Sequence, residues 1–569
     1  MIMEKNDEIK SRRLFVLLYL LALTLAIFLK FIRLGALPLG DSEAVNALQA
    51  LKIVRGQPVT IGSQPGYIAL TSILFFIFNA GEFWARFWPA LFGVGLVFVP
   101  LLYRKWIGEK GALILAFLLA IEPGLTATSR SATGTMIGLV SLFAALGFYL
   151  NHKSIAAGIF CGLAILGGTA IWPGLIATGL TVLIYTLSAK KWPEIAIINP
   201  SRDDSPTDPF GWKAFTFSAA GCVLFVGTLF ILKPAVINGL GSSLVDYFRS
   251  WLSMGTTLKV LCLSLLFEQL LAIPLAIWGV VTGWRKKIGL TFLMLVALLV
   301  SLALTIANPS SRVVDLIWVL VPLWVLAEFG LEELISNLSK SEFLLKFFQT
   351  IITFSLLIFT YMNILSAVVK PDNSSEISPW VSILLPIALL IIITLLIGWG
   401  WSVEASKQGL IMGIGLILIF ATFGSAWKAG GLGSQPETEL WRFDPLPTGR
   451  DLLVKQVDEL SLWNTGKAED KMHIALLRVQ NPSLEWALRN YTIQEADILG
   501  TTETPAMVIT TSTDTSGLAQ TYRGQAFTWA NEVMFDQLSV SDWVKWYGFR
   551  QISTLDEGYL LWARTDLFK

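Results

Sequence analysis

Two carboxylates in the short segment "LGDSEAVNAL", Asp41 and Glu43, are side chains that can transfer a proton. They follow a long apolar run and begin a stretch of helical pattern that ends at Gly56. A carboxylate beside a hydroxyl or an amine can accept the proton of that group while it attacks an electrophilic carbon. The same residues also suit a helix start, because Asp and Ser cap free backbone amides and Glu favours the positive end of the helix dipole. The segment therefore predicts either a general base or a helix cap.

Four more charged residues lie at the edges of apolar runs, where ionisable side chains are costly and become candidates for function. Arg86 begins one run and Arg130 lies between two runs, so each is a candidate to bind a phosphate, with simple placement at the membrane interface as the alternative. Arg312 and Asp315 are three residues apart, which places them on one face of a helix. They predict either a phosphate contact by Arg312 or a salt bridge.

Two further candidates for substrate binding are Glu268 and Arg249. Glu268 lies deep in an apolar run with no opposite charge nearby along the chain, so it needs a partner on another helix, either in a site or in a structural ion pair. Arg249 belongs to "INGLGSSLVDYFRSWLSMG", whose amphipathic pattern predicts a helix on the membrane surface.

Histidine and cysteine chemistry is not expected. His152 and His473 are far apart, and the three cysteines, Cys161, Cys222 and Cys262, each lie in an apolar run. This argues against zinc-binding spacing, a Cys/His nucleophile pair and a disulfide framework. We assign no cofactor and no metal, although a divalent metal is compatible with the carboxylates. The net charge of +1 gives no reason to expect a nucleic-acid partner.

The composition indicates an α-helical multi-pass membrane protein. Of the 569 residues, 54% are apolar and 15% are charged. Soluble domains average about 45–50% apolar residues and about 25% charged residues. Thirteen apolar runs approach the length of roughly 20 residues that a membrane-spanning helix needs. The first run is expected to be retained, since no small-residue cleavage site follows it. The predicted spans are 14–32, 84–102, 111–126, 134–150, 155–171, 172–187, 214–232, 257–283, 290–307, 313–330, 347–369, 381–401 and 409–427.

Basic residues predict the orientation of these spans. Most Lys and Arg residues before Lys428 fall in segments such as "YRKWIGEK", "AKKW" and "WRKK", which places these segments and the N-terminus in the cytoplasm. An odd number of spans then puts everything after Trp427 outside the cytoplasm, and we expect a plasma (inner) membrane location. The run "GYIALTSILFFIFN" is too short to cross and predicts an interfacial or re-entrant helix within an outer loop over residues 33–83.

Two domains are expected, a membrane domain over 1–427 and a soluble α/β domain over 428–569. After Lys428 the chain is richer in Asp, Glu, Thr and Asn. The segments "HIALLRV", "AMVITTS" and "YLLWAR" predict strands, and "SLEWALRNY" and "SVSDWVKWYGF" predict helices. Without a Gly-rich phosphate loop or a Ser/His/Asp set, this domain is expected to be a lid or an acceptor-docking domain.

The order of these features resembles a known family. A first span, an outer loop with an acidic helix start, a short apolar segment after "QPGY", and "EFWARFWPALFGVGLVFVPLLYRKWIG" are similar to the C-type superfamily of membrane glycosyltransferases, in the branch of protein O-mannosyltransferases and aminoarabinose transferases. The resemblance covers about Leu14 to Leu187 and continues by topology to Trp427. It implies a C-type glycosyltransferase fold, with Asp41 and Glu43 in the acidic motif of the family.

The sequence also departs from the pattern of this family. Ser42 separates two carboxylates that are adjacent in the family, and "QPG" stands where the family often has His-Pro-Pro. Gly134 occupies a position that is often acidic, and "GGTAIWPGL" lacks a lysine that is frequent there. Which carboxylate is the base therefore stays open, and so does a non-catalytic role as a scaffold.

The resemblance implies transfer of a sugar from a polyprenyl-phosphate donor to an extracytoplasmic acceptor, which is a protein, a lipid or a glycan. In this hypothesis Arg86, Arg130 and Arg312 hold the phosphate, and Asp41 or Glu43 activates the acceptor. The lipid phosphate is itself the leaving group, so the chemistry does not require a metal. Membrane lipids are the other expected partners. A transporter or lipid flippase is the alternative from a different class, although no repeat relates the first six spans to the later ones.

Overall fold

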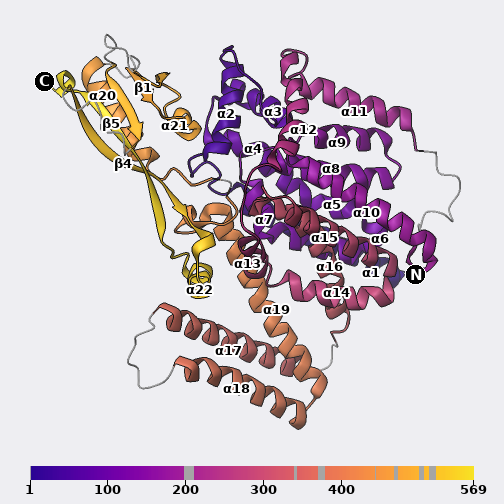
Figure 1. The fold of residues 1–569 in the computed structure, drawn as a ribbon. Coiled ribbons are helices and arrows are strands. Elements are labelled where there is room, and N and C mark those ends of the chain that lie inside the picture. The colour runs from indigo at the N-terminus through magenta and orange to yellow at the C-terminus, as the bar shows by residue number, and fades with distance from the viewer. Residues whose placement is uncertain are drawn as a thin grey trace.

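Helices make up the chain up to Trp427, and a five-stranded sheet follows (Figure 1). The computed structural model describes residues 2–197, 210–338, 342–369, 379–442, 444–466, 472–498, 505–511 and 521–568, with side chains from residue 12 onward. The helices before the sheet are α1 (Ile2–Phe31), α2 (Asp41–Val54), α3 (Pro65–Phe78), α4 (Glu82–Gly95), α5 (Val99–Leu102), α6 (Arg104–Ile121), α7 (Pro123–Ser129), α8 (Thr135–Leu150), α9 (Ser154–Ile165), α10 (Ile171–Lys191), α11 (Trp212–Gly227), α12 (Asn238–Ser250), α13 (Leu258–Glu268), α14 (Ala272–Lys286), α15 (Ile288–Ala307), α16 (Ile317–Ser336), α17 (Phe343–Val369), α18 (Pro379–Gly400) and α19 (Val403–Trp427).

The multi-pass architecture is confirmed. Fewer than thirteen helices, however, meet the requirements of length and apolar composition for a membrane span. Within the described residues, eight helices are long and apolar enough to cross a membrane, and up to ten if each bent pair counts as one span. The predicted spans 134–150, 155–171 and 214–232 fall on α8, α9 and α11, which have 16, 12 and 16 residues. A span ordinarily needs about 17–25 residues, so the number thirteen stays a prediction.

Two predicted spans, 111–126 and 257–283, are not continuous helices. The axis bends by 63° between α6 and α7 and by 80° between α13 and α14. Proline explains both breaks: Pro123 disfavours helical geometry at the residue before it, and the ring of Pro274 excludes the carbonyl four residues earlier. The two breaks meet, because Gln269 Nε2 donates to Glu122 Oε1 at 2.7 Å.

A third break lies elsewhere than predicted. The motif "WPG" at 172–174 was expected to separate two spans, but α9 already ends at Ile165 and α10 begins at Ile171. Pro173 therefore lies in the first turn of α10, where its missing amide hydrogen would have no helical partner. The short run "GYIALTSILFFIFN" does form a helix, α3, but Tyr67 and Ile68 are fully buried within the protein.

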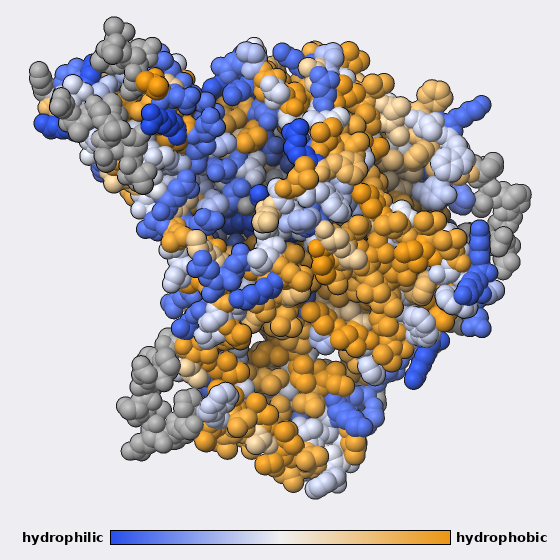
Figure 2. Space-filling view, in the orientation of Figure 1, coloured by the Kyte–Doolittle hydropathy of each residue, from blue (hydrophilic) through white to orange (hydrophobic). Residues whose placement is uncertain are grey.

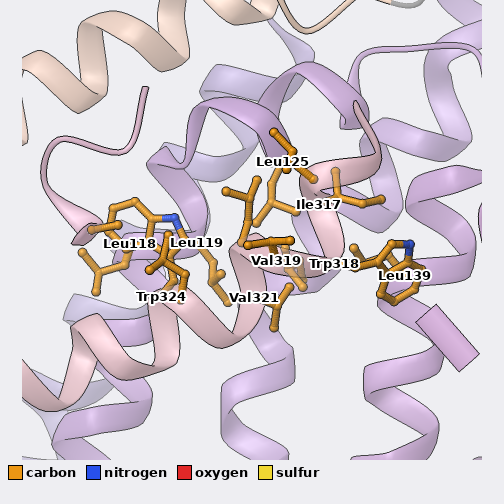
Figure 3. Close-up of a cluster of buried hydrophobic side chains, with 14 of the residues drawn as sticks. Leu118, Leu119, Leu125, Leu139, Ile317, Trp318, Val319, Val321 and Trp324 are labelled. Carbon is orange, nitrogen blue, oxygen red and sulfur yellow. The ribbon is translucent and has the colours of Figure 1, made fainter. Parts of the chain in front are cut away.

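Helix α16 is the centre of the helical part. Of its apolar stretch, 89% is buried in the protein, compared with 11% for α18. Figure 3 shows its side chains, including Trp318 and Trp324, packed against leucines of α6, α7 and α8. Glycines also allow α14 to pack tightly against α16. A Cβ on Gly279 would lie 1.8 Å from the carbonyl oxygen of Leu326. Small residues at such contacts are typical of helix packing in membranes.

The sheet is mixed rather than a simple α/β layer. Its strand order is β2-β1-β3-β5-β4, with β1 parallel to β2 and β3, and with β5 antiparallel to β3 and β4. The three predicted strands correspond to β1, β3 and β5, whereas β2, β4 and α20 were not predicted. The elements are α20 (Arg450–Thr465), β1 (His473–Leu477), α21 (Pro482–Ala487), β2 (Thr492–Ala496), β3 (Met507–Thr511), β4 (Tyr522–Val533), α22 (Val540–Phe549) and β5 (Thr554–Arg564).

The sheet and its helices, residues 450–568, are called the C-terminal sheet region. This region stands at one end of the helical part, beside α2 (Figure 1). Hydrophobic residues cover the helical part, and hydrophilic residues gather over the C-terminal sheet region (Figure 2). The distribution fits a bundle immersed in lipid with the sheet in water.

Helix α22 anchors the C-terminal sheet region to the helical part. Trp543 and Trp546 are fully buried in the main hydrophobic core. Arg550, directly after this helix, is paired with Glu439 at 2.9 Å and with Glu268 at 3.2 Å. All three charged residues are almost completely buried. The partner that Glu268 needs is therefore an arginine 282 positions away in the sequence.

Replacing Arg550 by Ala should destabilise the protein strongly. The change leaves two buried carboxylates without a counter-charge, and breaking a buried ion pair from one side costs about 3–5 kcal/mol. Thermal unfolding in detergent should show a clear decrease in Tm, while Lys545→Ala on the same helix should stay close to wild type. The triple variant Arg550→Met, Glu268→Gln, Glu439→Gln should recover much of the loss. An Arg550→Ala variant as stable as wild type would contradict this interpretation.

Candidate active site

Glu43 lies in a buried network that joins three separate segments. Its carboxylate accepts from Arg86 Nη2 at 2.6 Å and from Arg86 Nε at 3.0 Å. The amide of Ala132, in the loop after α7, donates to Glu43 Oε1 at 2.6 Å, and the amide of Gly40 donates to Oε2 at 3.2 Å. Both carboxylate oxygens are therefore used by the protein itself.

Arg86 in turn fixes the chain that leads into α2. Its guanidinium donates to the carbonyl oxygens of Leu37 at 2.7 Å and Pro38 at 2.8 Å. Burial alone would raise the pKa of Glu43, but the charge and hydrogen bonds of Arg86 outweigh it, and the pKa lies below its ordinary value. Glu43 thus stays ionised and paired, which makes it a poor proton acceptor and a good organiser of the loop.

Asp41 is the less constrained of the two motif carboxylates. It is half-buried at the first position of α2, and its Oδ1 accepts from the amide of Ser483 at 3.2 Å. Ser483 belongs to α21, so Asp41 lies where the helical part meets the C-terminal sheet region. Both oxygens of Glu43 are thus used in contacts within the protein, whereas Asp41 is only partly buried and makes one described hydrogen bond.

A third carboxylate, Asp444, completes the start of α2. The amide of Ser42 donates to Asp444 Oδ2 at 2.6 Å, so a residue 402 positions away supplies the cap that the helix lacks locally. Burial raises the pKa of Asp444, while the Ser42 hydrogen bonds oppose this shift. Asp444 is not among the site residues that the sequence predicts. Its only local signal is an acidic residue before proline in the segment that follows α19.

Arg312 approaches the same place from the helical part. Its Nη1 lies 3.9 Å from Asp444 Oδ1, and half of its side chain is exposed. Asp315 does not form a side-chain pair with Arg312 in the described contacts; its Oδ2 accepts the backbone amide of Arg312 at 2.9 Å and shapes the turn before α16. Among the predicted arginines, Arg312 is the one that lies beside Asp444 at the start of α2 with half of its side chain exposed.

Arg130 is instead used as a helix cap. It donates to the carbonyl oxygens of Leu29 at 3.0 Å and Lys30 at 3.1 Å, in the last turn of α1, and to that of Gly430 at 2.6 Å. Carbonyls at the end of a helix lack helical donors, and a cation there is favourable. Arg130 therefore holds α1 to the segment that follows α19.

A small cavity confirms that Arg86 and Arg130 face inward. Together with Glu43 and Arg442 they line a space of about 30 Å³. Such a volume holds about one or two water molecules. Three guanidinium groups around one carboxylate make this cavity electropositive.

The other predicted substrate-binding residues lie apart from this site. Glu268 is occupied by Arg550, as described above. Arg249 is exposed on α12. Neither is brought to the start of α2 by any described contact.

Two departures from the family pattern contact each other. Gln64 Oε1 accepts the amide of Gly134 at 2.6 Å and also lies 3.4 Å from Asn46 Nδ2. A Cβ on Gly134 would lie only 2.5 Å from the carbonyl oxygen of Gly167, so no side chain fits at this position without movement. The two positions at which the sequence departs from the family pattern are thus joined by a hydrogen bond from the backbone of Gly134 to the side chain of Gln64.

In the described part of the chain, no three His, Cys, Asp or Glu side chains lie close enough together to hold a metal ion. The candidate site is thus made of Asp41, Asp444, Arg312 and the first amides of α2, on a framework set by Glu43 and Arg86. This set can accept a proton and bind an anion.

Comparison with solved structures identifies the fold. The chain matches ArnT from Cupriavidus metallidurans, both bound to undecaprenyl phosphate and in the apo state, with TM-scores of 0.57 in each case. Sequence identity is 16% and 15%, and each match covers 96% of this chain and 98% of the other. The chain thus has the fold of ArnT, an aminoarabinose transferase with the C-type glycosyltransferase fold, and the resemblance seen in the sequence is confirmed at this level.

More distant comparisons add little. An oligosaccharyltransferase from Archaeoglobus fulgidus, solved with zinc and sulfate, matches with a TM-score of 0.36 and 15% identity over 84% of this chain and 62% of the other, which is too distant to inform the fold. No protein-family model matches the chain, and no curated protein sequence is similar to it.

The Glu43–Arg86 pair should make stability depend on pH. Because the pKa of Glu43 is depressed in the folded state, its stabilisation is complete above the unfolded value of about 4.3 and is lost as the pH falls through the lower folded value. At pH 7, Glu43→Gln should lower Tm clearly. The difference in Tm between wild type and this variant should shrink on acidification below about pH 4.5. Thermal unfolding across pH 3–7 tests this, with the exposed Glu109→Gln as control; a difference that does not change with pH would contradict it.

Proposed function

We propose that the protein is a membrane glycosyltransferase that transfers a sugar from a polyprenyl-phosphate donor to an acceptor outside the cytoplasm. The observation that carries the proposal is the cluster of Asp41, Asp444 and Arg312 at the start of α2, within a fold that matches ArnT over 96% of the chain. One of the matching structures is ArnT bound to undecaprenyl phosphate, which supports a lipid-phosphate donor here.

In the proposed reaction the acceptor hydroxyl or amine attacks the anomeric carbon of the donor sugar. Asp41 accepts the proton of the acceptor as the new bond forms. The bond between the anomeric carbon and the phosphate oxygen breaks, and its electron pair leaves with the lipid phosphate. Attack from the face opposite the leaving group inverts the anomeric configuration. The phosphate gains negative charge in this step, so a nearby guanidinium lowers the barrier.

Each remaining residue of the site has a proposed role. Arg312 binds the phosphate, because it is half exposed and projects beside the start of α2. Asp444 caps α2 through Ser42 and orients Arg312. Glu43 and Arg86 hold the loop in place and do not contact the substrate.

A transporter or lipid flippase is the second candidate. The observation in its favour is the contact between the breaks of two bent helices at Glu122 and Gln269, since discontinuous helices are frequent in transporters. Movement of a labelled lipid across vesicles without any release of free lipid phosphate would favour this candidate over the enzyme.

Replacing Asp41 by Asn should abolish transfer while leaving the protein folded. Loss of a general base typically lowers the rate by about 10²–10⁴-fold. The purified protein is incubated with a panel of radiolabelled polyprenyl-phosphate sugars, and the release of free lipid phosphate is measured. Glu43→Gln should lose activity together with Tm, whereas Asp41→Asn should lose activity alone. Full activity in both variants would overturn the assignment of this loop.

Replacing Arg312 by Ala should weaken donor binding. Since the guanidinium is proposed to bind the phosphate in both the ground state and the transition state, KM for the donor should rise and kcat should fall. Arg312→Lys should recover part of the loss, because it keeps the charge without the planar fork. Arg104→Ala, which removes an exposed arginine at the start of α6, is the control. A variant with unchanged kcat/KM would remove Arg312 from the site.

A further inference from the structure

A second, larger concavity lies between the C-terminal sheet region and the helical part. It has a volume of about 500 Å³, within the range of about 300–1,000 Å³ that is usual for ligand sites. We call it the α20 groove. Its lining comprises Glu82 at the start of α4, one face of α20, and residues at the end of α21; the residues are Glu82, Arg450, Asp451, Val454, Lys455, Asp458, Glu459, Leu462, Ala487, Arg489 and Asn490.

The charges of the α20 groove are mixed and held by one another. Glu82 pairs with Arg450 at 2.9 Å and lies 3.7 Å from Arg489. Arg489 also stacks on the ring of Trp486, 4.4 Å from its centre. The carboxylates and the cations nearly balance, so the groove does not favour a strongly charged ligand. A dense alternation of fixed donors and acceptors suits a ligand whose groups both donate and accept, as sugar hydroxyls do.

An exposed tryptophan, Trp463, lies near the end of α20 directly after Leu462, the last groove-lining residue of this helix. Lys455 and Glu459 form an i, i+4 pair in the groove lining, and Trp463 follows at the next i, i+4 position. The side chain of Trp463 is 82% exposed, although burying such a ring is strongly favourable. A flat apolar ring beside paired polar groups suits the apolar face of a sugar ring.

The α20 groove is also close to the candidate active site. The first turn of α21 contacts Asp41 through the amide of Ser483, and the residues after α21 line the groove. Helix α21 has six residues, and each residue of an α-helix adds about 1.5 Å to its length. One short helix therefore separates the groove from Asp41.

We propose that the α20 groove binds a carbohydrate, the glycan part of the acceptor, with Trp463 stacking on a sugar ring. This inference rests on the proposed function for its biological meaning, but the binding itself needs no donor and no catalysis. It goes further than the proposed function because it commits the acceptor to a glycan-bearing molecule and assigns its recognition to the C-terminal sheet region.

The test is direct binding of the full-length protein, in detergent and without donor, to a printed array of bacterial and mammalian-type oligosaccharides. The strongest glycan is then titrated in solution. Trp463→Ala should weaken binding at least tenfold, and Trp463→Phe should retain most of it because the ring is kept. Leu452→Ala, which shortens an exposed residue of α20 outside the groove lining, should bind as wild type.

Each outcome decides the proposal. Binding that depends on Trp463 but not on Leu452 supports it. Absence of binding to any oligosaccharide, or binding that is unchanged in Trp463→Ala, overturns it. Because lipid-phosphate release is measured separately, a protein that releases lipid phosphate but binds no glycan would leave the enzyme assignment standing without the groove. A protein that binds glycans but does not turn over any donor would leave the groove standing without the enzyme.

Discussion

The buried ion pair between Glu43 and Arg86 is the interaction on which the candidate site depends. It joins α2, α4 and the loop after α7, and Arg86 also holds the carbonyls of the chain that enters α2. Since each partner is buried, the loss of one would leave an uncompensated charge inside the protein. The pair thereby fixes the direction of α2 and places Asp41 at the edge of the C-terminal sheet region.

Residues after α19 supply further contacts to the start of α2. At the start of α2, the amide of Ser42 donates to Asp444, and Asp41 accepts a hydrogen bond from the amide of Ser483. Arg550 secures the C-terminal sheet region by entering between Glu268 and Glu439. An acceptor bound by this region would be presented to Asp41 by contacts that are already in place, which reduces the entropy cost of orienting it.

The broken helices serve the same junction. Irregular backbone within a membrane is tolerated where protein surrounds it, and here the breaks of two bent spans meet at Glu122 and Gln269. Glu268, which holds Arg550, is the last residue of α13, directly before one of these breaks. The bends therefore bring polar groups into the interior, where the C-terminal sheet region is attached.

The sequence by itself determined the helical membrane architecture, the positions of most helices, three of five strands and the motif at the start of α2. These features follow from apolar run length, strand pattern and capping residues, all of which act within about 20 residues. Tertiary structure alone decided that Glu43 pairs with Arg86, that Arg130 caps α1 and that Asp444 and Arg550 make long-range contacts. The last two pair with residues 402 and 282 positions away. No local pattern carries such pairings, because they are chosen by the packing of distant elements and by the high cost of leaving a buried charge unpaired.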